Sequence, residues 1–302
     1  MNSSHLTSDI TVGIKTFYRE NKLKQLFDSL IGIGFKEAIV ADDGKETESK
    51  ERLYKEYAKR LPLKVIRLDY DTGLSFGRNR IVDQTNTPYL LMLDDDQVVP
   101  KNINDLKQVL NADETIGGVS GYWNEYGHIR CDASNLYQRG DYLFKDTSKS
   151  PVLHKTGNVT YYLLDQIPNS TLFRTECLKK FPWDEHFKIG SEHVDFYLNH
   201  KHNSSWKFAV TPDVVITHDP KGEENYDTNF RLNQSRLQES RRYLLNKWQL
   251  KGIIEGRKLY HPKIPVSQRI KNTLISLHCP PNAVLAYQNL HRQIISKLKS
   301  YR

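Results

Sequence analysis

The sequence has few cysteines and no long apolar run. Its 302 residues include only 3 Cys, at positions 131, 177 and 279. They are too scattered for a disulfide framework or a zinc cluster, and they favour a reducing compartment. No apolar run approaches the roughly 18 residues of a transmembrane helix, and residues 1–8 lack the apolar core of a signal peptide. We therefore expect a cytoplasmic protein, either free or held on the inner face of a membrane.

Positive charge is concentrated towards the C-terminal end. The formal net charge of the chain is +8. Residues 221–302 hold 16 Lys/Arg and 5 Asp/Glu, a net of +11, whereas the remainder holds 28 and 31, a net of −3. Such an excess of cations attracts anionic lipid, nucleic acid or an acidic polymer. A non-catalytic polyanion-binding protein is therefore one hypothesis.

The most informative stretch is 89–97, in which apolar residues run directly into Asp94, Asp95 and Asp96. The apolar run does not alternate with polar residues, which predicts a strand covered on both faces. The acids then follow the carboxyl end of that strand, where open α/β sheets bind their ligands. Three adjacent carboxylates repel each other, and a hard divalent cation with oxygen ligands would offset that repulsion. The alternative is a solvated acidic turn.

Alternating strand and helix patterns predict the fold class. Strands are expected at 10–16, 37–41, 63–68 and 89–93, with helices between them. This order predicts a parallel, doubly wound sheet with right-handed crossovers. A mixed second half follows, with strands expected at 117–122, 159–164, 170–174, 206–210 and 214–217. Residues 124–150 are polar and irregular, which predicts a loop or a small excursion.

The basic tail has helical periodicity. We expect one long helix over 228–250 and a basic amphipathic helix over 284–298. Such a helix either packs on the preceding domain or attaches to a membrane surface. Both interpretations fit the sequence.

Three strand ends should meet at one edge of the predicted sheet: residues 16–19, the pair Asp42–Asp43, and the aspartate triplet. An acid at a strand end can accept hydrogen bonds from a base or a ribose, and a cation at the triplet can bridge phosphates. Arg78 follows the glycine-bearing loop 71–77 and opens a helix. Its charge and the helix N-terminus both suit a diphosphate.

The segments 11–19, 39–44, 73–79 and 93–96 together resemble those of family 2 nucleotide-sugar glycosyltransferases with a GT-A fold. Within that family they are most similar to β-1,4-N-acetylgalactosaminyltransferases. The resemblance covers about residues 10–220. It implies a GT-A domain over 1–220, with a nucleotide half over about 1–123 and an acceptor half over about 124–220. Residues 221–302 would then form a basic helical extension.

The resemblance also implies an activity. The chain would move GalNAc, GlcNAc or Gal from a UDP-sugar to a hydroxyl of a glycan or glycolipid acceptor, in a metal-dependent and inverting reaction. Peripheral membrane contact would come from the tail, and no nucleic acid partner is expected.

The resemblance assigns donor-binding roles at matching positions. Asp42 or Asp43 would hold the uracil or ribose, and Arg78 and Asn79 would lie beside the nucleotide. The predicted donor site also includes three residues at the strand ends: Thr16, Arg19 and Asp95.

The metal ligands are implied in the same way. Asp94 and Asp96 match the two ends of the family's Asp-any-Asp motif, with Asp96 the surer ligand of Mn²⁺ or Mg²⁺. His218 follows an apolar strand and matches a third ligand found in some members. A lone histidine is more often structural.

The catalytic base is expected near position 192. The family places it in a Glu-Asp pair at the start of a helix, matched here by Ser191-Glu-His-Val-Asp195. His193 stands where the aspartate would be, so the base is Glu192, His193 or Asp195, with the first two favoured. A neutral imidazole can accept a proton near pH 7. The departure also keeps open a transferase fold that has lost catalysis.

Two further interpretations compete with this one. A sugar-1-phosphate nucleotidyltransferase should carry a glycine- and arginine-rich loop after its first strand, but residues 15–19 contain no glycine. The polyanion-binding hypothesis leaves the acid-tipped strands unexplained. Among the aromatic residues, Tyr122, Trp123 and Trp183 either stack on sugar rings or belong to the core, and the core is favoured for Trp183.

Overall fold

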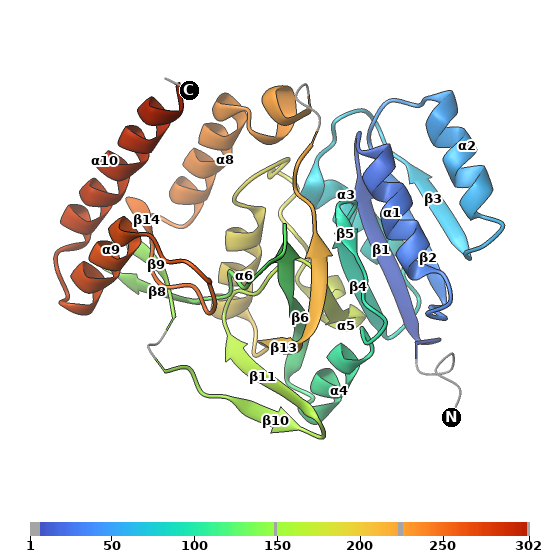
Figure 1. The fold of residues 1–302 in the computed structure, drawn as a ribbon, viewed down its shortest axis with the longest axis horizontal. Helices are drawn as coiled ribbons and strands as arrows, with labels where there is room; N and C mark the ends of the chain where they lie inside the picture. The colour runs from blue at the N-terminus through green and yellow to red at the C-terminus, as the bar shows by residue number, and fades with distance from the viewer. Residues whose placement is uncertain (1–6, 148–149, 223–225, 301–302) are drawn as a thin grey trace.

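A computed structural model describes residues 7–147, 150–222 and 226–300. Its centre is an 11-stranded sheet of order β10-β11-β13-β6-β12-β4-β1-β2-β3, with β5 beside β13 and β7 beside β6 (Figure 1). A separate 3-stranded sheet has the order β14-β9-β8. The strands are β1 (Ile10–Thr16), β2 (Glu37–Asp42), β3 (Leu63–Arg67), β4 (Tyr89–Asp94), β5 (Gln97–Val98), β6 (Ile116–Glu125), β7 (His128–Arg130), β8 (Asn135–Arg139), β9 (Tyr142–Asp146), β10 (His154–Thr156), β11 (Val159–Leu164), β12 (Thr171–Arg174), β13 (Lys207–His218) and β14 (Gly252–Glu255).

The first four strands form the predicted parallel unit. β1 pairs in parallel with both β2 and β4, and β2 pairs in parallel with β3. Lys15 is in register with Asp94, and Thr16 with Asp42. The carboxyl ends of β1, β2 and β4 therefore meet at one edge of the sheet, as the sequence predicts. The helices are α1 (Glu20–Leu30), α2 (Glu48–Tyr57), α3 (Leu74–Gln84), α4 (Asp105–Ala112), α5 (Thr175–Lys180), α6 (Glu192–Asn203), α8 (Gln234–Lys247), α9 (Val266–Ser276) and α10 (Pro281–Ser300).

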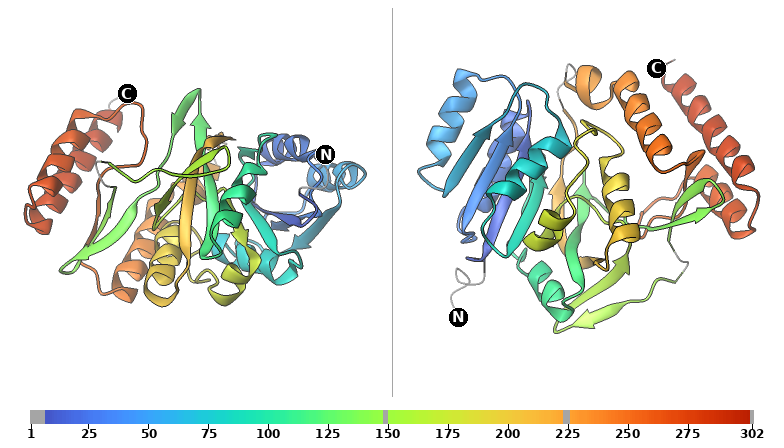
Figure 2. Two further views of the ribbon diagram at one scale, coloured as in Figure 1. Left: turned by 90° about the horizontal axis from the view of Figure 1, so that it is seen from below. Right: turned by 180° about the vertical axis from the view of Figure 1, so that it is seen from behind.

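Helices cover both faces of this sheet, which Figure 2 shows from two further directions. Alternate β1 residues, Val12 and Ile14 among them, enter one core with α1 and α2. Gly13 faces α3, where a Cβ atom would lie 2.5 Å from Ile81 Cγ2. Lys15 follows on that same face because strand residues alternate. Glycine at position 13 thus allows α3 to pack close to the strand that carries Lys15.

The second half is mixed, as predicted. β12 runs antiparallel to both β4 and β6, whereas β13 runs parallel to β6. The two strands predicted at 206–210 and 214–217 form one strand, β13, with a register shift between Thr211 and Val215. The register shift lies where the apolar pattern is interrupted, so the strand continues past this point. The end of β13 pairs with β5, which brings His218 beside Gln97.

The segment 124–150, predicted to be an irregular loop or a small excursion, is an excursion with regular strands. This segment contains β7 and a hairpin of β8 and β9, which turns at Gly140 with φ 56°. These strands are short and do not alternate regularly between apolar and polar residues, so they lack the pattern that marks a strand in sequence. Their stability comes from a distant partner, because β14 pairs in parallel with β9.

The tail packs against the rest of the protein. The helix predicted over 228–250 is divided into a π-helix (Asp227–Arg231) and α8, and Asn233 caps α8 by accepting a hydrogen bond from the Arg236 backbone. Leu244 of α8 is buried in the core on the α3 side of the sheet. A third core joins β9 and β14 to α9 and α10. In Figure 1, α9 and α10 (red) lie at the opposite end of the molecule from α1 and α2 (blue).

Two further properties complete the fold. All three cysteines are free, as expected. Among the described helices, none combines the length and apolar character needed to cross a bilayer.

A tight turn after β2 predicts a measurable stability effect. A Cβ atom on Gly44 would lie 1.8 Å from the Phe17 carbonyl oxygen, and this backbone atom cannot move without shifting the end of β1. We expect Gly44→Ala to lower the free energy of unfolding by about 2 kcal/mol or more, measured by urea denaturation. Lys45→Ala, at the exposed neighbouring position, is the control. Equal stability of the two variants would contradict the close contact.

Candidate active site

A cavity of ≈270 Å³ lies at the edge where β1 and β4 end. Elements from both halves of the chain contribute to its wall, including the end of β13 and the start of α6. Its lining residues are Lys15, Thr16, Phe17, Arg19, Leu74, Asp94, Asp95, Asp96, Trp123, Asn169, Ile189, Gly190, Glu192, His193, His218, Tyr226 and Arg231.

Each carboxylate of the aspartate triplet has its own polar partners. Asp94 accepts from Arg78 Nη2 at 2.9 Å and from the Asn169 amide. Asp95 accepts from Thr16 Oγ1 at 2.7 Å. The Arg19 guanidinium bridges Asp95 and Asp96, with a contact of 2.5 Å to Asp96. The solvated acidic turn is thus excluded, because Asp95 and Asp96 are buried.

The acidity of the triplet residues follows from these partners. Burial raises the pKa of the Asp95 carboxyl, with Arg19 opposing the change. Burial also acts to raise the pKa of Asp96, but the hydrogen bond to His218 and the charge of Arg19 outweigh it and lower the pKa to about 2. Asp96 is therefore an anion at neutral pH, available to a cation.

His218 lies between two carboxylates. Its Nε2 atom is 3.5 Å from Asp96 Oδ2, and its Nδ1 atom is 2.5 Å from Glu125 Oε1. Burial opposes protonation, yet the two acids raise the pKa of the imidazole. The ring also packs against Trp123 in a tilted arrangement, with centroids 4.4 Å apart and an interplanar angle of 39°. Glu125 was not predicted, and no sequence pattern marks it, because it reaches the site from the end of β6.

The side chains at the triplet could hold a divalent metal ion, but with few protein ligands. Among the described residues, no group of three or more His, Cys, Asp or Glu side chains is arranged to hold an ion. Mg²⁺, however, is commonly held by one or two carboxylates and by substrate phosphates. Asp96 Oδ1 is buried and has no hydrogen-bond partner, so a carboxylate oxygen remains available. The Asp94 carboxylate is engaged by Arg78 and Asn169.

Arg78 connects the triplet to the start of α6. It is buried, and its guanidinium lies 2.9 Å from Asp94 and 3.7 Å from Glu192. Asn79, the next residue of α3, has both ends of its amide bonded to the 183–185 segment. Neither side chain lines the cavity: Arg78 lies behind Asp94 and Glu192, and Asn79 fixes a loop.

Asp42 and Asp43 also lie behind the cavity wall. Asp42 accepts hydrogen bonds from Lys50 at 2.8 Å, from Arg67 at 2.8 Å and from Tyr54. Asp43 pairs with Lys15 and accepts from the Gly73 backbone at 2.8 Å. These pairs fix the strand ends, and Asp43 acts on the cavity through Lys15.

Lys15 is a lining residue that the sequence prediction did not include. Its side chain is buried, and Nζ contacts Asp43 and donates to the Thr16 carbonyl at 2.9 Å. Glycine at position 77 makes room for it, since a Cβ atom there would lie 2.4 Å from Lys15 Cδ. A lone lysine within an apolar strand is the sequence feature that could have identified it. Tyr226, Arg231 and Asn169 carry no comparable feature.

The residues of the 192–195 segment lie in the first turn of α6 and face two different sides of that helix. Glu192 and His193 line the cavity, and His193 Nε2 is 3.5 Å from Glu192 Oε1. Asp195 instead faces α8, where it accepts from Trp248 Nε1 at 2.7 Å and pairs with Lys247 at 2.8 Å. Ser191 is the N-cap residue, with φ 68°, but its side chain makes no capping hydrogen bond.

Two cavity groups of α6 have properties that suit proton transfer. Glu192 Oε2 is buried without a hydrogen-bond partner. Burial lowers the pKa of the His193 imidazole to about 4, with the Glu192 charge opposing the change. The imidazole is therefore neutral at pH 7 and can accept a proton.

The three aromatic residues singled out from the sequence divide into core residues and one that lines the cavity. Trp183 is buried and stacks on Phe196 at 4.5 Å, so it is part of the core. Trp123 lines the cavity and donates through Nε1 to Ser170 Oγ at 2.7 Å. Tyr122 is buried beside it and does not line the cavity.

The sequence of the chain matches one protein-family profile. The profile described as Glycosyl transferase family 2 matches residues 11–192. A search of curated proteins returns no match.

Solved structures share the fold. The structure of S. aureus TarS 1–349 in complex with UDP-GlcNAc is 17% identical, with a TM-score of 0.57 over 80% of this chain and 66% of that one. S. aureus TarS 1–349 alone is 19% identical, with a TM-score of 0.51 over 70% of this chain and 60% of that one. GalNAc-T7 with UDP, GalNAc and Mn²⁺ is 16% identical, with a TM-score of 0.53 over 71% and 44%. The chain thus covers less than two thirds of each neighbour.

The bridge made by Arg19 generates a stability prediction. Arg19→Met would leave Asp95 and Asp96 buried with less positive charge, so we expect the free energy of unfolding at pH 7 to fall by about 3 kcal/mol. The folded-state pKa of Asp96 lies below its usual value, so its contribution to stability is present at neutral pH and is lost as the pH falls through about 2. Urea denaturation at pH 7 measures the loss.

The control is Arg60→Met, which removes an exposed ion pair with Asp28 at 3.7 Å. Such pairs contribute about 0.5 kcal/mol. If both variants lost the same stability, Arg19 would not be the counter-ion of the triplet.

Proposed function

The chain belongs to glycosyl transferase family 2, and we propose that it transfers a sugar from a UDP-sugar to a hydroxyl group of a glycan. The observation that supports this most strongly is the cavity itself. Cationic Lys15 and Arg19 line it together with the aspartate triplet and with two potential bases at the start of α6. Family membership favours a glycosyltransferase over a nucleotidyltransferase. The neighbours bound to UDP-GlcNAc and to UDP support the choice of donor.

In this proposal, the donor diphosphate lies beside Lys15 and Arg19. Both cations are already positioned by carboxylates, so they need little reorganisation to stabilise the negative charge of the leaving group. Phe17 and Tyr226 line the same cavity and offer aromatic surface to the uracil. Asp43 acts indirectly, by holding Lys15.

The proposal includes a Mn²⁺ or Mg²⁺ ion that binds at Asp96. Its unpartnered Oδ1 and the His218 imidazole, once deprotonated, would hold the ion. A bound ion would supply further positive charge to the departing diphosphate. The Mn²⁺ in the GalNAc-T7 structure supports this choice.

Glu192 and His193 are the proposed bases. The acceptor oxygen attacks the anomeric carbon as the bond from that carbon to the diphosphate breaks, and the hydroxyl proton passes to the Glu192 carboxylate or the His193 imidazole. Attack opposite the leaving group inverts the anomeric centre. The proposed donor sugars are GalNAc, GlcNAc and Gal.

Donor turnover tests the class of reaction. UDP release is measured from UDP-GalNAc, UDP-GlcNAc and UDP-Gal, with Mn²⁺ and with chelator. We expect slow hydrolysis of one donor, at least tenfold slower with chelator or in Asp96→Asn. Asp83→Asn, at an exposed position outside the cavity, is the matched control. Failure of the wild type to bind any of the three donors in calorimetry would refute the proposal.

The identity of the base is tested through the pH dependence of donor turnover. His193→Gln and Glu192→Gln should each be compared with wild type, and loss of the true base should lower kcat about 100-fold or more. The pKa of His193 is lowered to about 4, so a His193 base is active above that pH and loses activity as the imidazole protonates below it. His193→Gln should remove this acid limb. An unchanged profile in both variants would exclude both residues.

A further inference from the structure

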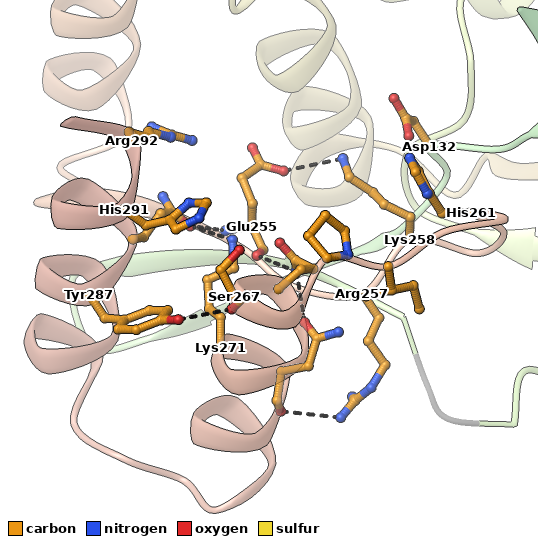
Figure 3. Close-up of a pocket in the computed structure, with 15 residues that line it drawn as sticks. Asp132, Glu255, Arg257, Lys258, His261, Ser267, Lys271, Tyr287, His291 and Arg292 are labelled. Atoms are coloured by element: carbon orange, nitrogen blue, oxygen red, sulfur yellow. Dashed lines mark hydrogen bonds and ion pairs between the residues drawn. The ribbon is translucent and has the colours of Figure 1, made fainter. Parts of the chain in front are cut away.

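A second cavity, of ≈530 Å³, lies in the C-terminal part of the chain, between α9, α10 and the segment that follows β14 (Figure 3). It is larger than the cavity at the sheet edge and shares no lining residue with it. Its volume falls within the range of about 300–1,000 Å³ that is typical of small-molecule sites. Nothing in the proposed transfer uses it.

The charges around this cavity are unbalanced. Four cationic side chains line it, and only two carboxylates do. Glu255 is already paired with Lys145 at 3.4 Å and Lys258 at 3.3 Å, and Asp132 with Arg130 at 3.2 Å. The remaining cations of the cavity are Arg257, Lys271 and Arg292.

Arg257 is paired as well, with Asp146 at 3.5 Å. Lys271 and Arg292 are different: within the described part of the chain, neither has a carboxylate at ion-pair distance. Lys271 is 7% exposed, and its Nζ donates to the neutral Gln288 amide at 3.1 Å. A buried cation without a counter-ion is unfavourable.

The titration of nearby groups agrees with this excess of positive charge. Burial lowers the pKa of Lys271 to about 8; Glu255 opposes the change, and Arg292 and Lys258 add to it. The pKa of Arg241 is also lowered, by burial and by Arg292. An anion between α9 and α10 would relieve this repulsion.

The other lining groups suit a hydroxylated ligand. Ser267 and Asn272 of α9 and His291 of α10 supply polar atoms, and Ile264 and Pro265 supply an apolar edge. Inorganic phosphate alone would fill little of this volume. A sugar ring that carries a phosphate or carboxylate matches both the charge and the size.

Two routes connect this cavity to the active site. Ion pairs run from Asp96 through His218, Glu125 and Arg130 to Asp132, a wall residue of the second cavity. Tyr260, 46% exposed, also packs on Tyr122 at 5.9 Å. Tyr122 is the neighbour of Trp123 in β6. Tyr122 is buried, so this second contact runs through the protein interior and offers no surface to a sugar.

We propose that the second cavity binds an anionic sugar unit of the acceptor glycan, with Lys271 and Arg292 as its counter-ions. The role of the ligand as acceptor rests on the proposed function. The binding of an anion in this cavity does not depend on it. One sugar unit of the acceptor would then bind in the second cavity, while another unit of the same glycan reaches Glu192 and His193.

The test uses the full chain and glucose 6-phosphate as the probe, with glucose and inorganic phosphate beside it, in calorimetry. We expect glucose 6-phosphate to bind the wild type, and to bind Arg292→Gln at least tenfold more weakly. Arg269→Gln is the matched control, because Arg269 is an exposed residue of α9 that does not line the cavity. Lys271→Met should also weaken binding, and Arg292→Gln keeps the test valid if Lys271→Met does not fold.

Each other outcome overturns a stated part. Equal affinity in Arg292→Gln and Arg269→Gln would exclude the site. Inorganic phosphate binding as tightly as glucose 6-phosphate would exclude the sugar. Vesicles with 30% phosphatidylglycerol that bind the wild type and Arg269→Gln but not Arg292→Gln, without any binding of glucose 6-phosphate, would identify a lipid headgroup instead. UDP-GlcNAc binding to the wild type tests the proposed function separately.

Discussion

The structure depends on keeping three adjacent carboxylates together at the buried end of β4. Their mutual repulsion and the loss of water would disfavour ionisation, so the fold brings cations to them from three directions. Arg78 comes from α3, Arg19 from the loop after β1, and His218 from the far end of β13. These contacts join both halves of the chain, so the electrostatic requirement of one site also determines how the halves dock.

Much of this could be predicted from the sequence because it depends on local patterns. The apolar run into Asp94 indicates a buried strand with a functional end, and the order of elements gives the parallel sheet. Glu192 and His193 could be placed at the site because they match the Glu-Asp pair that the resembled family carries at the start of a helix. In the structure both residues line the cavity, whereas Asp195, one turn along the same helix, faces α8. Which side of α6 faced the cavity could not be read from a short polar segment.

The features that escaped prediction depend on distant partners. Glu125 orients His218 from another strand, and Asn169 reaches Asp94 from the loop that precedes β12, so neither has a pattern of its own. Asp42 and Asn79 were predicted to bind the donor but do not face the cavity. Asp42 is instead bonded to Lys50, and Asn79 to the 183–185 segment. Proximity to a motif did not determine which side chains face the cavity.

The pairing of β14 with β9 has a consequence for how the protein is made. The β8–β9 hairpin leaves the ribosome about a hundred residues before β14 does, a delay of about 5–20 s at common rates of synthesis. During that time the edge of β9 that will pair with Gly252–Glu255 has exposed backbone hydrogen-bonding groups. Such an edge can pair with another chain. A nascent chain of this protein is therefore open to intermolecular strand exchange until Gly252–Glu255 has emerged.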